Sequence, residues 1–361
     1  MAVTNLSSDM TSIAPHARNT GDAVLVLRAL GLGDAMAGIP ALRGIRRRWP
    51  ERFIALAAGP VIGEWLRHLG VIDEVLPTTG LQPLSWPPPA WISGGGHIAV
   101  DLHGKGPLSH RVLMTTSPDQ LVAFHCPLAG HLTGPTWRLD EHEVDRWCRL
   151  VRSAGGECDS SDLRLPARGP RGDEVILHPG AASGARRWPV ARWAWLAHRL
   201  AITGHRVVVT GGPGEDDLCT AISAGVHSLS PDHQLAIQVR AGSLSLPALA
   251  DVIGRARLLI SGDTGVAHLA TAFGTRSVLL FGPTPPAWWG PAVDQDLHTV
   301  LWHGAQAAPG DPHGACIDPA LDAISGEEVL SAAESQLARA KRDAAAAGQT
   351  NRQSDSIRRA S

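Results

Sequence analysis

The feature that most constrains the fold of this chain is an alternation between short apolar runs and longer segments with helical periodicity. Ala23–Leu27 and Phe53–Ala58 are continuous apolar runs of a length typical of buried strands. Between them, apolar residues in 36–49 recur at helical spacing, which predicts a helix that ends at Pro50. Strands that alternate with helices predict parallel β–α–β units, in which the loops at the carboxyl ends of the strands carry function.

The alternation occurs twice, once on each side of a polar segment rich in proline and glycine. In the first half we expect further strands at 71–76, 97–102 and 120–124, and helices at 61–69 and 140–154. In the second half we expect strands at 174–177, 206–210, 258–260 and 277–281, and helices at 190–200, 215–223, 246–256 and 264–273. At about 150 residues per domain, a chain of 361 residues has room for two domains.

We therefore expect an α/β protein with two Rossmann-like, doubly wound parallel-sheet domains that face each other across a cleft. The expected divisions are a flexible lead-in (1–20), an N-terminal domain (21–156), a linker (157–173), a C-terminal domain (174–325), a C-terminal helix (326–342) and a disordered tail (343–361).

Charge and composition restrict the partners and the compartment. The chain has 32 basic and 34 acidic residues, so no global field draws it to nucleic acid or to an anionic membrane. No apolar run reaches the length of about 18 residues that a spanning helix needs, and the first residues lack the pattern of a signal peptide. The five scattered cysteines fit a reducing compartment. We expect a soluble, cytoplasmic protein with no nucleic-acid partner and no stable membrane insertion; peripheral attachment to the inner membrane face through the basic tail stays open.

The first motif is a glycine turn after the first strand, in LRALGLGDAMAGIPALRGIRRRWP (27–50). Gly31 and Gly33 allow the backbone to approach a ligand closely, because glycine has no Cβ. Asp34 stands where the turn becomes a helix, so its plain role is that of the helix N-cap. A carboxylate at the carboxyl end of a strand that faces a cleft is equally well placed to act as a general base.

This turn departs from the dinucleotide-binding fingerprint in two places. Met36 occupies the position of the third glycine, and the strand at 53–58 ends without the acidic residue that binds an adenosine ribose. Both departures disfavour a nicotinamide-dependent oxidoreductase, which remains an alternative.

Two further turns follow strands of the second half. In ILHPGAASGARRWP (176–189) a small-residue loop precedes Arg186 and Arg187. Loop amides together with a guanidinium suit a phosphate, whereas the plain interpretation is two solvated loop charges. In VVVTGGPGEDD (207–217) a glycine turn leads into a helix with Glu215 at its start, which is a weak signal by itself.

The strongest motif is SGDTGVAHLATAFGTRSVLLFGPTPPAWWGP (261–291). Asp263, Thr264 and Gly265 form a turn that opens a helix, where free N–H groups and the helix dipole favour an anion such as a diphosphate. His268 lies one turn further on, and it is interpreted either as a ligand contact or as a satisfied helical histidine. The tryptophans 288 and 289 suit either stacking on a base or core packing.

Other signatures are absent or weak. The chain has no GxSxG, no GxxxxGK[ST] and no HExxH motif, and its histidines lack metal-ligand spacing, so we expect no metal. In DLHGKGPLSHR (101–111), His103, Lys105 and His110 are candidate groups for binding a second substrate; an ordinary polar surface loop is the alternative.

Together, the motifs at 27–50, 178–189, 211–217 and 261–291 resemble glycosyltransferase family 9, the heptosyltransferase-like group. The resemblance implies a GT-B fold and an inverting, metal-independent transfer, typically from ADP-heptose. It implies that Asp34 is the catalytic base and that Arg186 binds phosphate during catalysis, although many members carry lysine at this position. The donor-binding residues that follow from it are Gly180, Arg186, Glu215, Asp263, Thr264, Gly265 and His268, and those on the acceptor side are Gly33, His103, Lys105 and His110.

The sequence therefore predicts a glycosyltransferase without a cofactor, because the nucleotide sugar is a substrate. The C-terminal half is expected to hold the nucleotide diphosphate sugar donor, and the N-terminal half a glycan, glycolipid or small-molecule acceptor. The alternatives are a nicotinamide-dependent oxidoreductase and a non-catalytic nucleotide-sugar-binding protein.

Overall fold

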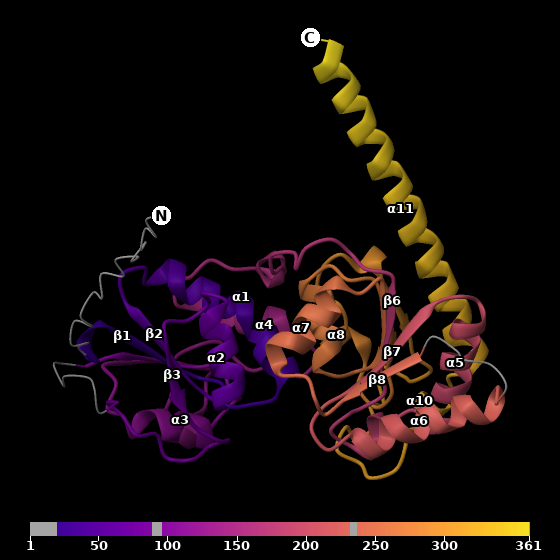
Figure 1. The fold of residues 1–361 in the computed structure, drawn as a ribbon. Helices are drawn as coiled ribbons and strands as arrows, with labels where there is room; N and C mark the ends of the chain where they lie inside the picture. The colour runs from indigo at the N-terminus through magenta and orange to yellow at the C-terminus, as the bar shows by residue number, and fades with distance from the viewer. Residues whose placement is uncertain (1–19, 89–95, 232–236, 361) are drawn as a thin grey trace, which may run out of the picture.

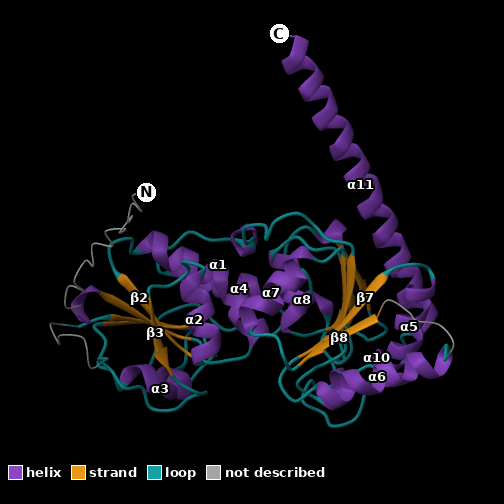
Figure 2. Cartoon of the chain, in the orientation of Figure 1, coloured by secondary structure: helices purple, strands orange, loops and turns teal. Residues whose placement is uncertain are grey.

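A computed structural model describes residues 20–88, 96–231 and 237–360 (Figure 1). The described chain forms two α/β halves, each built around one sheet with helices packed against it (Figure 2). The two-sheet α/β architecture predicted from the sequence is confirmed. The expected lead-in lies, apart from Thr20, outside the described residues.

The N-terminal half contains a five-stranded sheet of order β3-β2-β1-β4-β5 in which every pairing is parallel. The central strand β1 is buried on both faces, which explains its uninterrupted apolar run. The strands are β1 (Ala23–Leu27), β2 (Phe53–Ala58), β3 (Glu74–Pro77), β4 (Ile98–Asp101) and β5 (Gln120–Val122), and the helices are α1 (Leu32–Arg48), α2 (Pro60–His68), α3 (Leu108–Met114) and α4 (Glu143–Ser153).

The C-terminal half contains a six-stranded parallel sheet of order β11-β10-β9-β6-β7-β8. Its strands are β6 (Glu174–His178), β7 (Arg206–Gly211), β8 (Ile237–Ala241), β9 (Leu258–Gly262), β10 (Ser277–Leu280) and β11 (His298–Leu301). Its helices are α5 (Val190–Ile202), α6 (Asp216–Leu229), α7 (Leu246–Arg255), α8 (Gly265–Ala272), α9 (Pro286–Trp289), α10 (Pro319–Asp322) and α11 (Gly326–Ala360). Short 3₁₀ turns occur at Thr20–Asp22, Pro127–Ala129, Ser160–Leu163, Gly184–Arg186 and Gln295–Leu297.

Five helices and strands were not predicted from the sequence, namely α3, α9, α10, β8 and β11. Helix α3 is only seven residues long, too short to show a helical period. Strands β8 and β11 lie at the two edges of their sheet and are largely half-buried or exposed, so they lack a continuous apolar run. The tertiary pairing with β7 and β10, and not local periodicity, makes them strands.

The last helix is longer than predicted. It begins at Gly326 as expected, but it continues to Ala360, through residues that we expected to form a disordered tail. The run of four alanines at 344–347 favours helix, and no proline interrupts the segment. Figure 1 shows this end of α11 projecting away from both halves.

The two halves touch through α1 and α8, whose N-terminal ends approach each other closely. A Cβ on Gly265 would lie 2.7 Å from the Cβ of Leu32, and one on Gly33 would lie 3.0 Å from Cδ2 of His268. At position 265 the approach requires glycine, which has no Cβ. The approach brings the turns after β1 and β9 to the same place between the halves, with apolar side chains of both halves in one core cluster.

Candidate active site

A cavity of about 650 Å³ lies between the two halves, at the carboxyl ends of their strands. The turn at 30–34, after β1, forms one wall. The opposite wall comes from the C-terminal half and includes Ala182, Arg186, Asp263, Thr264, Gly265, His268, Thr284, Trp288, Trp289 and His313. A cavity of this size at this position in parallel α/β sheets is typical of a ligand site.

Asp34 lines the cavity from the N-terminal side, and the plain interpretation of Asp34 as the helix N-cap is wrong. Gly31 is the N-cap of α1, and Asp34 is the third residue of the helix. Its carboxylate accepts hydrogen bonds from the backbone N–H groups of Gly31 and of Asp34 itself. A carboxylate in the first turn can reach back to the N-cap in this way. Asp34 therefore both stabilises the start of α1 and faces the cavity.

The environment of Asp34 makes it more basic than an ordinary aspartate. Burial raises its pKa, and the negative charge of Glu143 raises it further, while Arg28 and the backbone hydrogen bonds lower it. The side chain remains 30% exposed on the cavity side. It is thus an accessible carboxylate with a raised pKa, as a general base requires.

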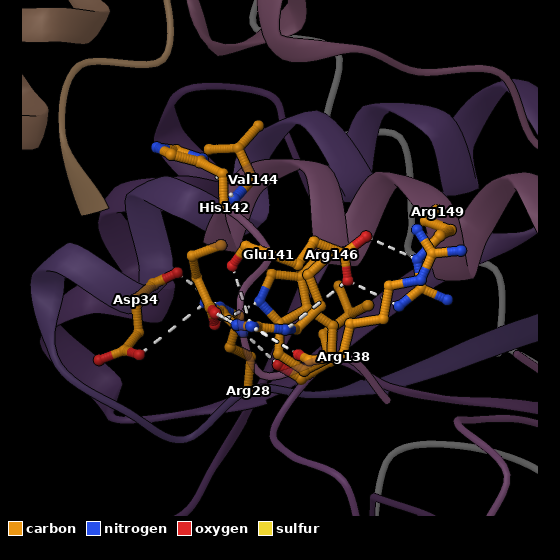
Figure 3. A network of polar contacts seen from close by, with 11 residues as sticks. Arg28, Asp34, Arg138, Glu141, His142, Val144, Arg146 and Arg149 are labelled. Atoms are coloured by element: carbon orange, nitrogen blue, oxygen red, sulfur yellow. Dashed lines mark hydrogen bonds and ion pairs between the residues drawn. The ribbon is translucent and has the colours of Figure 1, made fainter. Parts of the chain in front are cut away.

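Arg28, which follows β1 directly, is a neighbour of this carboxylate that sequence reasoning missed (Figure 3). Its side chain is 1% exposed, and Nη2 lies 3.9 Å from Oδ1 of Asp34 and 3.6 Å from Oε1 of Glu143. Nε donates to the backbone carbonyl of Asp34 at 2.5 Å. A basic residue between a buried strand and a glycine turn was the available signal.

The opposite wall presents donors for an anion. Arg186 donates from Nη1 to the backbone carbonyl of Asp263 at 3.2 Å, which places the guanidinium beside the turn that opens α8. Thr264 is the N-cap of α8, and its buried hydroxyl has no hydrogen-bond partner among the described residues. Burial raises the pKa of Asp263 to about 6, with Arg186 lowering it and Asp34 raising it. This wall supplies a guanidinium and a helix N-terminus, as phosphate binding requires.

Part of the chain, including most of the cavity wall from the C-terminal half, is similar to a known protein family. Residues 139–311 match the family model described as glycosyltransferase family 9 (heptosyltransferase). Over these residues the chain is therefore similar to a glycosyltransferase family 9 domain. The expected resemblance and the expected enzyme class, a glycosyltransferase, are confirmed.

Relatives extend the similarity beyond that domain. The lipopolysaccharide heptosyltransferase 2 of Salmonella typhimurium is 24% identical over 316 residues, which cover 74% of this chain and 85% of the relative. A family 9 glycosyltransferase of Veillonella parvula has a similar structure, with a TM-score of 0.69 and 20% identity over 90% of this chain and 100% of the other.

The structure of the E. coli ADP-heptose LPS heptosyltransferase II aligns with a TM-score of 0.66 and 18% identity, covering 88% of this chain and 99% of the other. At these identities the two structures show the fold, which is the predicted GT-B arrangement.

His268 is buried in the cavity wall next to Trp289, with ring centroids 5.7 Å apart. Burial and the nearby charges of His142 and Arg28 lower its pKa to about 4, so the ring is neutral near pH 7. Trp288 and Trp289 both line the cavity, and Trp289 also packs against the apolar core. Trp289 thus packs in the core and also faces the cavity, and stacking on a base stays a prediction.

Two predicted donor-binding residues are not among those that line the cavity. Glu215 accepts a hydrogen bond from the backbone N–H of Gly212 at 2.7 Å and stands just before α6. It lies so close to Gly180 that a Cβ there would be 2.0 Å from its carboxylate. Gly180 and Glu215 thus contact each other, and their donor-binding role stays a prediction.

The predicted acceptor-side residues do not all line the cavity. Gly33 lines the cavity, whereas His103, Lys105 and His110 do not. His103 accepts at Nδ1 from the backbone N–H of Ala29 at 3.3 Å, and of the three residues only Lys105 is exposed.

His110 is completely buried, with Nε2 3.4 Å from the buried carboxylate of Asp101. The alternative of an ordinary polar surface loop is therefore wrong for His110, because α3 packs this face of the segment against β4. Burial raises the pKa of Asp101 to about 6 and lowers that of His110 to about 4.

His142, which was not predicted, joins the two halves near the cavity. Its Nδ1 accepts from the backbone N–H of Val144 at 3.2 Å, and its Nε2 lies 3.0 Å from the carbonyl of Gly290. The neutral tautomer with the proton on Nε2 satisfies both contacts. The start of α4 is thus fixed to the loop after α9.

In the described segments, no group of three or more His, Cys, Asp or Glu side chains is arranged to hold a metal ion. Within the same segments, no helix has both the length and the apolar character needed to cross a membrane.

Proposed function

We propose that the protein transfers a sugar, with inversion and without a resident metal, from a nucleotide diphosphate sugar to an acceptor hydroxyl. ADP-heptose is the proposed donor, because a relative of the same fold is an ADP-heptose heptosyltransferase. The observation that carries the proposal is one cavity with the carboxylate of Asp34 on one wall and Arg186 with the start of α8 on the other.

On the acceptor side, Asp34 takes the proton of the attacking hydroxyl while that oxygen bonds to the anomeric carbon. A carboxylate is a weak base for an alcohol, so proton transfer and bond formation are concerted. The raised pKa of Asp34 increases its basicity, since burial disfavours its charged form. Attack from the face opposite the diphosphate inverts the anomeric configuration.

On the donor side, the main requirement is to stabilise the charge that develops on the departing diphosphate. Arg186 offers a planar set of donors, and the first amides of α8 add the positive end of the helix dipole. The unpaired hydroxyl of Thr264 is a further donor beside them. Such pre-oriented donors are worth about 3 kcal/mol each in other enzymes. The acceptor class stays as predicted, a glycan, glycolipid or small molecule.

A panel of nucleotide sugars tests the proposal. We expect the pure protein, given an acceptor preparation, to release ADP from ADP-heptose faster than it releases UDP or GDP from the matching hexose donors. The product anomer, read by NMR, is expected to be inverted. EDTA is expected to leave the rate unchanged, because the guanidinium and the helix N-terminus provide the positive charge. A rate that vanishes with EDTA and returns with Mg²⁺ would contradict the metal independence, and NAD binding without transfer would contradict the reaction.

The glycine contact between α1 and α8 is tested by Gly265→Ala. The added Cβ would lie 2.7 Å from the Cβ of Leu32, which a side-chain rotation cannot relieve. We expect a loss of about 1–3 kcal/mol in the free energy of unfolding and weaker binding of ADP, measured by thermal melts and calorimetry. Gly59→Ala, with no atom within 4 Å of the added Cβ, is the matched control. Equal effects of the two substitutions would show that the close approach is not required.

A further inference from the structure

A line of alternating charges connects Asp34 to the surface of the N-terminal half. Arg28 lies between the carboxylates of Asp34 and Glu143, and Glu143 is in turn paired with Arg146. The line continues outward, and Figure 3 shows its labelled members. Its three acids and three bases, in spatial order, are Asp34, Arg28, Glu143, Arg146, Glu141 and Arg149.

The middle of this line is rigidly held. The guanidinium of Arg28 lies over the ring of Trp147 at 4.8 Å and donates to the carbonyl of Leu102. Gly38 makes room for it, since a Cβ there would be 2.8 Å from Cδ of Arg28. Glu143 is 8% exposed, and its Oε1 accepts from Nε1 of Trp147 at 2.7 Å. These contacts orient both groups beside Asp34.

Arg28 does not close a hydrogen-bonded pair with either carboxylate. Its Nη2 is buried and has no hydrogen-bond partner among the described residues, and it stays at 3.9 Å from Asp34 and 3.6 Å from Glu143. The guanidinium is therefore shared by two anions. Asp34 is the more exposed of these two carboxylates, and it lines the cavity.

We propose that Glu143 is a positioning residue for Asp34: by sharing Arg28, it prevents a closed Arg28–Asp34 ion pair and leaves the Asp34 carboxylate free and basic toward the cavity. The catalytic meaning of this inference rests on the proposed function of Asp34. Removing the Glu143 charge would leave Arg28 opposite Asp34 alone, which would stabilise the ionised carboxylate and weaken it as a base.

Charged groups from both halves of the protein face Asp34. They are Arg28 at the end of β1, Glu143 at the start of α4 and, from the C-terminal half, Asp263. The His268 ring across the cavity is neutral near pH 7. Glu143 is not among the lining residues, so its charge can be removed without altering the cavity wall.

The experiment is a ¹³C NMR titration of the Asp34 carboxyl in protein labelled with ¹³C-aspartate, its signal identified by its loss in Asp34→Asn. In Glu143→Gln, which keeps an oxygen for Trp147, we expect the pKa of Asp34 to fall by about half a unit or more, roughly threefold in proton affinity. The acid limb of the kcat profile is expected to move to lower pH with it, and the plateau rate to fall.

Glu141→Gln is the matched control, because it removes the same charge on the far side of Arg146. We expect it to leave the Asp34 titration unchanged. An unshifted titration in Glu143→Gln, or equal shifts in both variants, would overturn the proposal and leave Glu143 a purely structural residue.

If Glu143→Gln does not fold, Glu143→Asp replaces it, since it keeps the charge but withdraws it from Arg28 by one methylene. A smaller shift in the same direction is then expected, and an unmoved titration refutes the proposal. The titration needs neither donor nor acceptor. Turnover that survived in Asp34→Asn would refute the base assignment separately.

Discussion

Asp34→Asn is expected to reduce sugar transfer by about 10²–10⁴-fold while leaving nucleotide binding close to that of the unaltered protein. Asparagine keeps the shape of the side chain and an oxygen that can accept the backbone N–H bonds at the start of α1. It removes the negative charge that takes up the proton of the acceptor hydroxyl. Transfer is measured as ADP release, and binding by calorimetry with ADP.

The pH dependence of the unaltered enzyme provides a second measure of the same assignment. Because the pKa of Asp34 is raised, the ionised form that acts as base is lost as the pH falls through that raised value. We expect an acid limb in kcat above the pH at which an ordinary aspartate titrates. Asp217→Asn, an exposed aspartate in the first turn of α6, is the control and should keep both rate and limb. Near-normal turnover in Asp34→Asn would contradict the role of base.

Arg186→Ala is expected to weaken donor binding and to slow the chemical step, together by about 10²–10³-fold in kcat/KM. The guanidinium stands beside the turn that opens α8, where the diphosphate is proposed to bind. Its loss removes a charge that is most needed as the leaving group departs, so kcat falls as well as affinity. Steady-state kinetics with varied ADP-heptose measure both effects.

Arg187→Ala is the matched control for this substitution. Arg187 is the next residue, but it donates from Nε to the carbonyl of Ala181 and does not line the cavity. We expect it to keep normal kinetics with some loss of stability. Arg186→Lys, which restores the charge without the planar donor set, is expected to recover part of the rate. Unchanged kinetics in Arg186→Ala would show that Arg186 is a solvated loop charge with no part in donor binding or catalysis.

Much of the fold could be predicted because buried parallel strands and their helices leave a local pattern. Helix α8 was expected at 264–273 and spans Gly265–Ala272, since a strand and a glycine turn precede it. The edge strands β8 and β11 and the short helix α3 were missed, because half-buried or very short elements have no such pattern.

The candidate site could be predicted only in part, because only some of its residues belong to a local sequence pattern. Residues in turns directly after strands, such as Asp34 and Asp263, were found because parallel sheets bring those turns to one edge. Gly180 and Glu215 follow the same rule, yet they contact each other instead of lining the cavity. Residues such as Glu143 and His142 could not be found, because their role depends on partners from distant parts of the chain.

The sequence by itself determined the two parallel sheets, the glycine turns after their strands and the family to which these motifs point, because each depends on neighbouring residues. The tertiary structure alone decided which of those turns meet across the cavity and how Arg28 is shared by Asp34 and Glu143. Charges act through space and burial, so the basicity of a carboxylate depends on what the fold places around it.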